Sequence, residues 1–189
     1  MSKYRFQNSD CAGPGPAISE FRILTSDISV VPYHATMSSP RRSHVRDAQA
    51  ISDLIGLYVA DGTLLPRTPE FIAERAIDFL VTEVDGRVVG CVHLDEYSPS
   101  LVEVRSLAVD SEYQGRGIGI GLVKAAEALA RVREYRTVFA VSSNDEFFRS
   151  QGYDVRHIPE LDRERSEVSR YKGVFAKDIE QPAAASQSS

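Results

Sequence analysis

The spacing of apolar residues predicts two helices in the first half of the chain. In the first, apolar side chains recur every three or four positions after Asp47, a residue type that often caps a helix, and the pattern stops near Asp61 and Gly62. The second begins at Pro69, which suits a first helical turn, and Thr68 precedes it as the expected cap. The apolar faces consist of Ile51, Leu54, Ile55 and Tyr58 in the first helix, and Phe71, Ile72, Ala76 and Phe79 in the second.

Strand patterns alternate with helical ones through the rest of the chain. Residues 79–84 and 87–97 are joined by Asp85-Gly86 and predict a β-hairpin. Residues 101–109 predict a further strand, followed by a glycine-rich turn and a long helix over about 117–132. The remaining predicted elements are a strand at 137–142, a short helix at 145–151 that ends at Gly152, and two strands near 153–157 and 171–177. Helices and a mixed sheet that share one core indicate an α/β or α+β fold.

The two ends of the chain differ in composition from the middle. Residues 1–37 include the turn-rich run Cys11-Ala-Gly-Pro-Gly-Pro16 and are predicted to form a partly flexible extension, although residues 21–33 carry enough β-formers for an added strand. Residues 181–189 are small and polar, which predicts a disordered tail. We therefore expect one domain over residues 38–180.

Composition narrows the classes of function. Hydrophobic residues make up 42% of the 189 positions and charged residues 26%, which suits a soluble globular protein, while a net charge of −5 argues against general nucleic-acid binding. No segment approaches the ~20 apolar residues that cross a membrane, and the start lacks a secretory signal. Two cysteines and four scattered histidines indicate neither a disulfide framework nor a metal site. We expect a cytoplasmic, metal-free protein that acts on a small molecule.

The glycine-rich turn carries the strongest chemical signal. It reads Gln114-Gly-Arg-Gly-Ile-Gly119 and joins an apolar strand to the start of a helix. Glycines let backbone N–H groups approach a ligand closely, and the helix start adds partial positive charge, so such a turn is typical of a phosphate or pyrophosphate site. The ending of a Walker loop is absent, and the glycine spacing differs from the Rossmann fingerprint. A turn without a ligand is the structural alternative.

The turn resembles the coenzyme A pyrophosphate loop of the GNAT superfamily of N-acetyltransferases. The pattern is Gln114-x-x-Gly117-x-Gly119 after a strand that ends Leu107-Ala-Val109, and Phe147-Phe148-x-x-x-Gly152-Tyr153 resembles a later segment of that family. The resemblance covers about residues 38–180. It implies the GNAT fold, in which helices flank a central mixed, mostly antiparallel sheet and the pyrophosphate loop lies between a splayed strand and a long helix. It implies acetyl-CoA as co-substrate, bound by Leu107, Ala108, Val109, Gln114, Gly115, Arg116, Gly117, Ile118 and Gly119.

A narrower resemblance is to the acetyltransferase domain of bacterial N-acetylglutamate synthases. It rests on Leu64-Leu-Pro-Arg-Thr68, Glu103-Val-Arg-Ser-Leu-Ala-Val109, Val138-Phe-Ala-Val141 and the tail over residues 158–179. This likeness implies acetyl transfer to the α-amino group of glutamate, the first step of arginine synthesis. Many such enzymes carry an amino-acid-kinase-like domain in front, for which 189 residues leave no room, so we expect a standalone short form. A homodimer is the assembly that the superfamily suggests.

Glu103 is the candidate general base. Glu103, Arg105 and Leu107 alternate along the predicted strand and would face one side of it. The resemblance places this face at the catalytic cleft, where Glu103 could accept the proton of the substrate ammonium directly or through one water. A structural salt bridge or an exposed strand face is the alternative.

Three arginines are candidates for binding substrate carboxylates. Arg67 lies in the loop that resembles the substrate-binding segment of the family, and a guanidinium can grip an α-carboxylate with two parallel hydrogen bonds. A solvated loop arginine is the alternative. Arg105 is a candidate for the side-chain carboxylate. Arg170 falls where the resembling tail has a substrate-contacting arginine, although Lys172 stands where that tail has a serine.

The proton donor to the departing thiolate is unassigned. Many GNAT enzymes have a tyrosine where this chain has Phe148, and Ser142, Ser143 and Tyr113 are weaker candidates. Backbone N–H groups over residues 107–109 could stabilise negative charge on the thioester oxygen.

Two other functions stay open from the sequence. One is a GNAT enzyme with a different acceptor, such as glutamine, another amine or a protein N-terminus, and the other is a coenzyme A-binding module without turnover.

Overall fold

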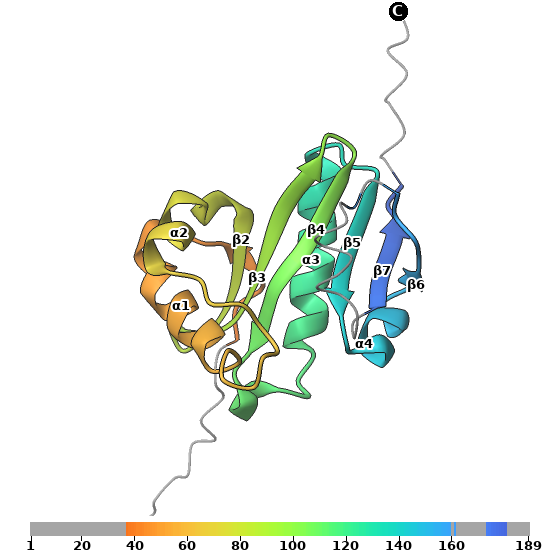
Figure 1. The fold of residues 1–189 in the computed structure, drawn as a ribbon. Helices are drawn as coiled ribbons and strands as arrows, with labels where there is room; N and C mark the ends of the chain where they lie inside the picture. Colours follow the sequence, from red (N-terminus) through yellow and green to blue (C-terminus); the bar gives the residue numbers. More distant parts are fainter. Residues whose placement is uncertain (1–36, 160, 162–172, 181–189) are drawn as a thin grey trace, which may run out of the picture. The chain divides into compact units, whose positions relative to one another are not determined.

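A seven-stranded sheet forms the centre of the structure (Figure 1). The computed structural model describes residues 37–159, 161 and 173–180. In spatial order the strands are β1 (Arg41–Arg42), β2 (Phe79–Val84), β3 (Arg87–Ser98), β4 (Leu101–Val109), β5 (Thr137–Ser142), β7 (Gly173–Asp178) and β6 (Asp154–Val155). The neighbouring pairs are antiparallel except for β4 and β5, which are parallel. The mixed, mostly antiparallel sheet is therefore confirmed.

Helices cover both faces of this sheet. The α-helices are α1 (Ala48–Gly56), α2 (Pro69–Glu74), α3 (Ile118–Val132) and α4 (Asp145–Ser150), and short 3-10 helices occur at η1 (Val45–Asp47), η2 (Ala76–Asp78) and η3 (Ser111–Tyr113). Side chains of β2 alternate between two cores, because successive residues of a strand point to opposite faces. Phe79 and Val81 pack with α1 and α2, whereas Leu80 and Val84 pack with α3 and α4. Figure 1 shows α1 and α2 beside β2, and α3 behind β4.

Most predicted elements lie where the pattern placed them. The hairpin and the strands of residues 101–109 and 137–142 are confirmed, and α2 follows Thr68, whose Oγ1 accepts a hydrogen bond from the Phe71 N–H at 3.2 Å. The first helix is shorter than predicted, since α1 ends at Gly56 and turns continue to Gly62. The possible strand within residues 21–33, the tail 181–189 and the start of the last predicted strand lie outside the described residues.

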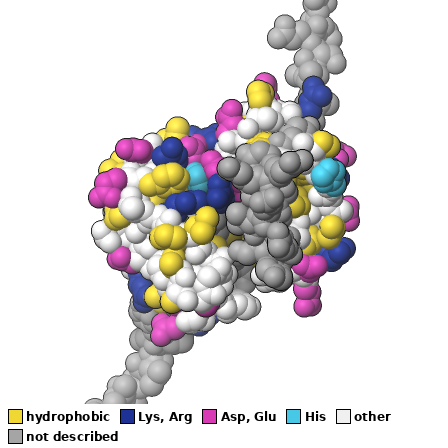
Figure 2. Space-filling model, in the orientation of Figure 1, with side chains coloured by type: hydrophobic (Ala, Val, Ile, Leu, Met, Phe, Trp, Pro, Cys, Tyr) yellow, Lys and Arg dark blue, Asp and Glu magenta, His cyan; other side chains and the backbone are white. Residues whose placement is uncertain are grey.

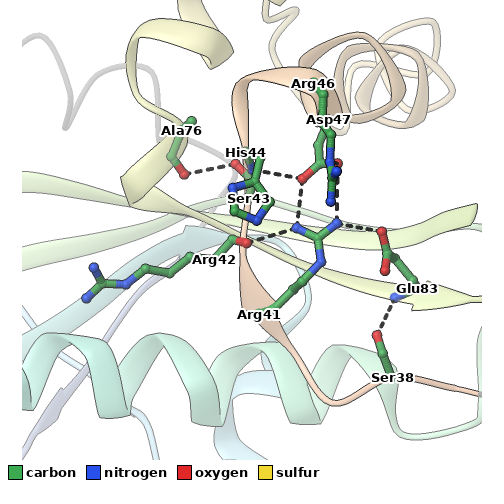
Figure 3. A network of polar contacts seen from close by, with 9 residues as sticks. All are labelled: Ser38, Arg41, Arg42, Ser43, His44, Arg46, Asp47, Ala76 and Glu83. Atoms are coloured by element: carbon green, nitrogen blue, oxygen red, sulfur yellow. Dashed lines mark hydrogen bonds and ion pairs between the residues drawn. The ribbon is translucent and has the colours of Figure 1, made fainter. Parts of the chain in front are cut away.

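A network of polar contacts holds β1 and η1 against β2 (Figure 3). Arg41 forms ion pairs with Asp47 at 2.7 Å and with Glu83. Asp47 is only 7% exposed, and burial opposes its ionisation, but hydrogen bonds from Arg41 and the His44 N–H outweigh this effect and lower its pKa. Asp47 precedes α1 as predicted, yet its carboxylate makes no capping bond to that helix. The Asp47 carboxylate instead accepts hydrogen bonds from Arg41 and from the His44 N–H.

Candidate active site

The parallel pair β4 and β5 separates part-way along its length. Pairing joins residues 101–103 to residues 137–139 only, although β4 continues to Val109 and β5 to Ser142. In the described part of the chain, one backbone edge of β4 beyond Glu103 therefore has no strand beside it. The splayed strand that the resemblance implied is confirmed.

A cleft of about 900 Å³ opens at this separation. Its walls come from the turn after α1, the loop before α2, the second half of β4, the glycine-rich loop with the start of α3, and the end of β5 with the start of α4. The lining residues include Tyr58, Leu64, Leu65, Arg67, Glu103, Arg105, Leu107, Val109, Tyr113, Gln114, Gly115, Gly117, Gly119, Ser142, Ser143 and Phe147. Glu103, Arg67, Arg105 and the predicted cofactor loop thus meet at one cleft, whereas Arg170 lies outside the described residues.

A β-bulge at Ser106 changes which way the side chains of β4 point. Ser106 has a φ of 49°, and the pairing with β3 shifts between Cys91 and His93 because β4 contributes an extra residue there. Leu107 packs on the α3 side of the sheet. The expectation that Leu107 shares a face with Glu103 and Arg105 is therefore wrong, since the extra residue reverses the alternation.

Glu103 and Arg105 face the α1 and α2 side of the sheet. Val102 and Val104, their neighbours in β4, pack in the core on the opposite side. Arg105 pairs across the strands with His93, whose ring stacks on Phe79 with centroids 4.3 Å apart and meets the α2 side chain Phe71 edge-on. Figure 2 shows acidic and basic side chains gathered on the surface beside α2.

Charged groups surround Glu103, which is 6% exposed. The Nε of Arg105 lies 3.7 Å from the Glu103 carboxylate, and its Nη1 donates to Asp95 at 2.8 Å. Asp95 lies directly opposite Glu103 in β3. Burial, and then repulsion from Arg105, lower the pKa of Arg67. Sequence reasoning found three of these four groups but missed Asp95.

Arg67 is held firmly but keeps a donor available. Ser52 donates a hydrogen bond to the Arg67 carbonyl oxygen at 2.7 Å, and the guanidinium carbon lies 5.0 Å from the centroid of the Phe71 ring. The Nε of Arg67 is buried and has no hydrogen-bond partner among the described residues. Because a buried donor without a partner is costly, this arrangement suits a carboxylate ligand.

The glycine-rich loop has the conformation of an anion cradle. Gly115 and Gly117 have φ values of 72° and 81°, a region that side chains disfavour. Gly117 precedes α3, and among the described residues no side chain caps this helix start. The first N–H groups of a fifteen-residue helix, with its positive dipole end, can therefore face a phosphate.

Tyr58 is a cleft residue that sequence reasoning treated only as part of an apolar helix face. Its hydroxyl donates to the Val109 carbonyl oxygen and accepts from Gln114 Nε2 at 2.9 Å. Gln114 Nε2 also lies 3.1 Å from the Val109 oxygen. No local sequence signal could have found these contacts, because Tyr58 is 51 residues from Val109 and 56 from Gln114.

Phe148, which stands where the resemblance implied a tyrosine, is 5% exposed and packs in an aromatic cluster with Tyr153 and Phe175. It has no group that could donate a proton. Ser142 and Ser143 line the cleft, and the Ser142 hydroxyl accepts a hydrogen bond from the Asn144 N–H at 3.0 Å. The proton donor therefore stays unassigned.

The described residues show neither a metal-binding cluster nor a membrane-spanning helix. No group of three His, Cys, Asp or Glu side chains in these ranges could hold a metal ion. Nor do these ranges contain a helix long and apolar enough to cross a membrane.

Comparison with known proteins gives consistent matches. The model of the acetyltransferase (GNAT) domain matches residues 75–155. An uncharacterized N-acetyltransferase of Chlorobaculum tepidum is 39% identical over 113 residues, which cover 60% of this chain and 73% of that protein. An amino-acid acetyltransferase of Mycobacterium tuberculosis is 34% identical over 116 residues, covering 60% of this chain and 66% of the relative.

Longer relatives match over part of their length. The amino-acid acetyltransferase of Ralstonia nicotianae is 28% identical over 151 residues, which cover 79% of this chain but 34% of the relative. The crystal structure of N-acetylglutamate synthase from Neisseria gonorrhoeae, complexed with coenzyme A and N-acetyl-glutamate, superposes with a TM-score of 0.70 at 26% identity, over 78% of this chain and 36% of that one. The chain thus spans about a third of these longer proteins.

Proposed function

Because this chain belongs to the GNAT family of N-acetyltransferases, we propose that it transfers the acetyl group of acetyl-CoA to the α-amino group of L-glutamate. The single observation that carries the choice of acceptor is the arrangement of Arg67, Arg105 and Glu103 in one cleft beside the splayed strands. Relatives named amino-acid acetyltransferase, and a structural neighbour complexed with N-acetyl-glutamate, support an amino acid as acceptor.

The donor side of the cleft suits coenzyme A. The N–H groups of the loop over residues 115–119, together with the uncapped start of α3, can hold the pyrophosphate. The free edge of β4 over residues 107–109 offers backbone groups to the amide-containing arm and N–H donors to the thioester oxygen. Acetyl-CoA supplies the activated acyl group. The role of the loop is to hold the cofactor so that its thioester lies next to the acceptor amine.

The acceptor side provides a base and carboxylate-binding groups. Glu103 removes a proton from the ammonium, directly or through one water, so that the nitrogen lone pair can attack the thioester carbonyl. Arg67 holds the α-carboxylate through its available donors. Arg105 is the candidate for the second carboxylate, although it already pairs with Asp95 at 2.8 Å. Transfer is direct, and the proton on the leaving sulfur comes from a group not yet assigned.

The test is a screen of the twenty amino acids with acetyl-CoA, in which release of free coenzyme A thiol is measured. We expect a glutamate-dependent rate well above that of the other amino acids. A higher rate with glutamine or another amine would overturn glutamate as the acceptor, while acetyl transfer from acetyl-CoA would still hold. Binding of acetyl-CoA in calorimetry without turnover of any amine would contradict the catalytic proposal itself.

A further inference from the structure

Tyr58 connects two parts of the cleft that are far apart in the sequence. Its hydroxyl lies between the end of β4 and the start of the glycine-rich loop, where it bonds to the Val109 oxygen and to Gln114 Nε2. Its own carbonyl oxygen accepts the N–H of Leu64 at 2.9 Å, and Leu64 begins the segment that leads to Arg67. One residue thus contacts both the loop assigned to the cofactor and the segment assigned to the acceptor.

The glycine-rich loop needs such an anchor. Gly115 and Gly117 have no side chains that could restrain the backbone, and an added Cβ at either would meet no atom of the described residues within 4 Å. On the other side of η3, Asp110 fixes the chain by accepting from the Glu112 N–H at 3.1 Å and pairing with Arg87 at 2.7 Å. Among the described contacts, the Gln114 side chain is what ties the loop itself to the turn after α1.

The direction of the loop N–H groups depends on this hydrogen bond between Gln114 and Tyr58. Gln114 directly precedes the first left-handed glycine, so a rotation at Gln114 would turn the following peptides away from the cleft. Gln114 Nε2 has two hydrogens, and its distances to the Tyr58 hydroxyl and the Val109 oxygen, 2.9 and 3.1 Å, allow one bond to each. The amide is therefore held at two points.

We propose that Tyr58 is a positioning residue that holds the glycine-rich loop in its pyrophosphate-binding form through Gln114. The inference rests on the proposed binding of coenzyme A but not on which amine is accepted. Tyr58 acts here without touching the reacting atoms. Removal of its hydroxyl should weaken interactions with the pyrophosphate more than those at the edge of β4, where this hydroxyl bonds to the Val109 carbonyl oxygen.

The first test is a double-mutant cycle on coenzyme A binding, measured by calorimetry. Tyr58→Phe should weaken the affinity roughly 3- to 10-fold, the usual effect of one lost hydrogen bond. Gln114→Ala should weaken it at least as much, and the double variant should be no weaker than Gln114→Ala within about twofold, because both changes remove the same restraint. Tyr135→Phe is the matched control, since it also removes a bonded hydroxyl, from Glu96, outside the cleft.

A second measurement separates positioning from loss of structure. The value of kcat/KM with acetyl-CoA should fall in Tyr58→Phe, whereas kcat/KM with acetyl-pantetheine, which lacks the pyrophosphate, should fall clearly less. Equal losses with both donors, unchanged affinity in Tyr58→Phe, or effects that multiply in the double variant would each overturn the inference. Failure of the wild-type protein to bind coenzyme A would instead contradict the proposed function.

Discussion

At the scale of single residues, Arg67 is the side chain whose surroundings point most directly to a ligand. Its carbonyl oxygen is bonded to Ser52 and its guanidinium lies against Phe71, while a buried Nε donor is available. Burial also makes a charge-assisted bond stronger than it would be in water. The residue is therefore prepared for an anionic partner before that partner arrives.

Replacing Arg67 by alanine should mainly raise the KM for the amino acid. Loss of a charge-assisted pair of hydrogen bonds predicts an increase of about 10- to 100-fold, with a smaller change in kcat. Steady-state kinetics with varied glutamate and saturating acetyl-CoA measure this. Arg136→Ala, on an exposed arginine outside the cleft, is the control. An unchanged KM would mean that Arg67 has only a structural role.

Glu103→Gln should lower kcat by about 10²-fold or more, since general-base catalysis commonly contributes that much. Coenzyme A affinity should stay within about twofold, because glutamine keeps the shape of the side chain. Single-turnover rates and calorimetry on the same preparation provide both values. Glu134→Gln, at an exposed position after α3, should change neither. Full activity of Glu103→Gln over a range of pH would remove Glu103 as the base.

Some of these residues could be found from the sequence and others could not. Glu103, Arg67 and the glycine-rich loop stand in short motifs, so local spacing is enough to single them out. Asp95 reaches Arg105, and Tyr58 reaches the cleft, only because β3 and the turn after α1 fold against β4. A contact between residues so far apart leaves no mark on local spacing.

At the scale of elements, the close packing of α3 on β3 sets the position of the cofactor loop. Gly90 of β3 lies beneath α3, and an added Cβ there would come within 2.8 Å of Ile118 Cγ2 and 3.0 Å of Leu122 Cδ1. Ile118 is the first residue of α3, directly after the loop. The absence of a side chain at Gly90 thus lets the helix start approach the sheet.

Gly90→Ala should destabilise the protein by about 1–3 kcal/mol, the usual cost of overpacking a core. Coenzyme A affinity should fall as well, because the helix start must move outward. Unfolding in urea and calorimetry test the two effects. Gly121→Ala in α3 is the comparison, since its Cβ would meet Pro40 at an ordinary 3.7 Å. That variant should be neutral or slightly more stable, and equal behaviour of the two variants would contradict the packing argument.

Elements with strong periodicity were predictable, and those that depend on distant partners were not. The strands over residues 101–109 and 137–142 bury regular apolar runs, so pattern and structure agree. The strand β1 consists of two arginines and has no apolar pattern. It pairs with β2 through contacts between Arg41, Asp47 and Glu83 that only the folded chain provides. The bulge at Ser106 escaped prediction because the strand pattern over residues 101–109 does not fix where an extra residue is inserted.

At the scale of the whole molecule, His93 links folding stability to pH. It is 1% exposed between Phe79 and Phe71, and burial lowers its pKa to about 4. Nearby charges act in both directions, since Asp95 and Asp78 favour the protonated ring while Arg67 and Arg105 oppose it. The unfolded chain, with an ordinary histidine, takes up its proton near pH 6.5. The contribution of His93 to the free energy of unfolding is therefore fully present above about pH 6.5.

The free energy of unfolding should fall as the pH drops from about 6.5 to about 4, because the unfolded state binds the proton first. The full contribution of His93 over that range is about 3 kcal/mol. Urea unfolding of the wild type and of His93→Gln at several pH values measures it, and the variant should have a shallower slope. His157→Gln, at an exposed site, is the comparison variant. A wild-type slope in His93→Gln would contradict the assignment.

The bulge at Ser106 divides β4 into two segments in which the alternation of side chains between the two faces is reversed. Before it, Glu103 and Arg105 point toward the side of α1 and α2, and after it, Leu107 points toward α3. Under the proposed function, the side chains that meet the amine and those that pack beneath the glycine-rich loop would be different residues on opposite faces of one strand. For enzyme engineering, this separation would allow the amine preference to be redesigned on one face without changes to the acyl-donor side on the other.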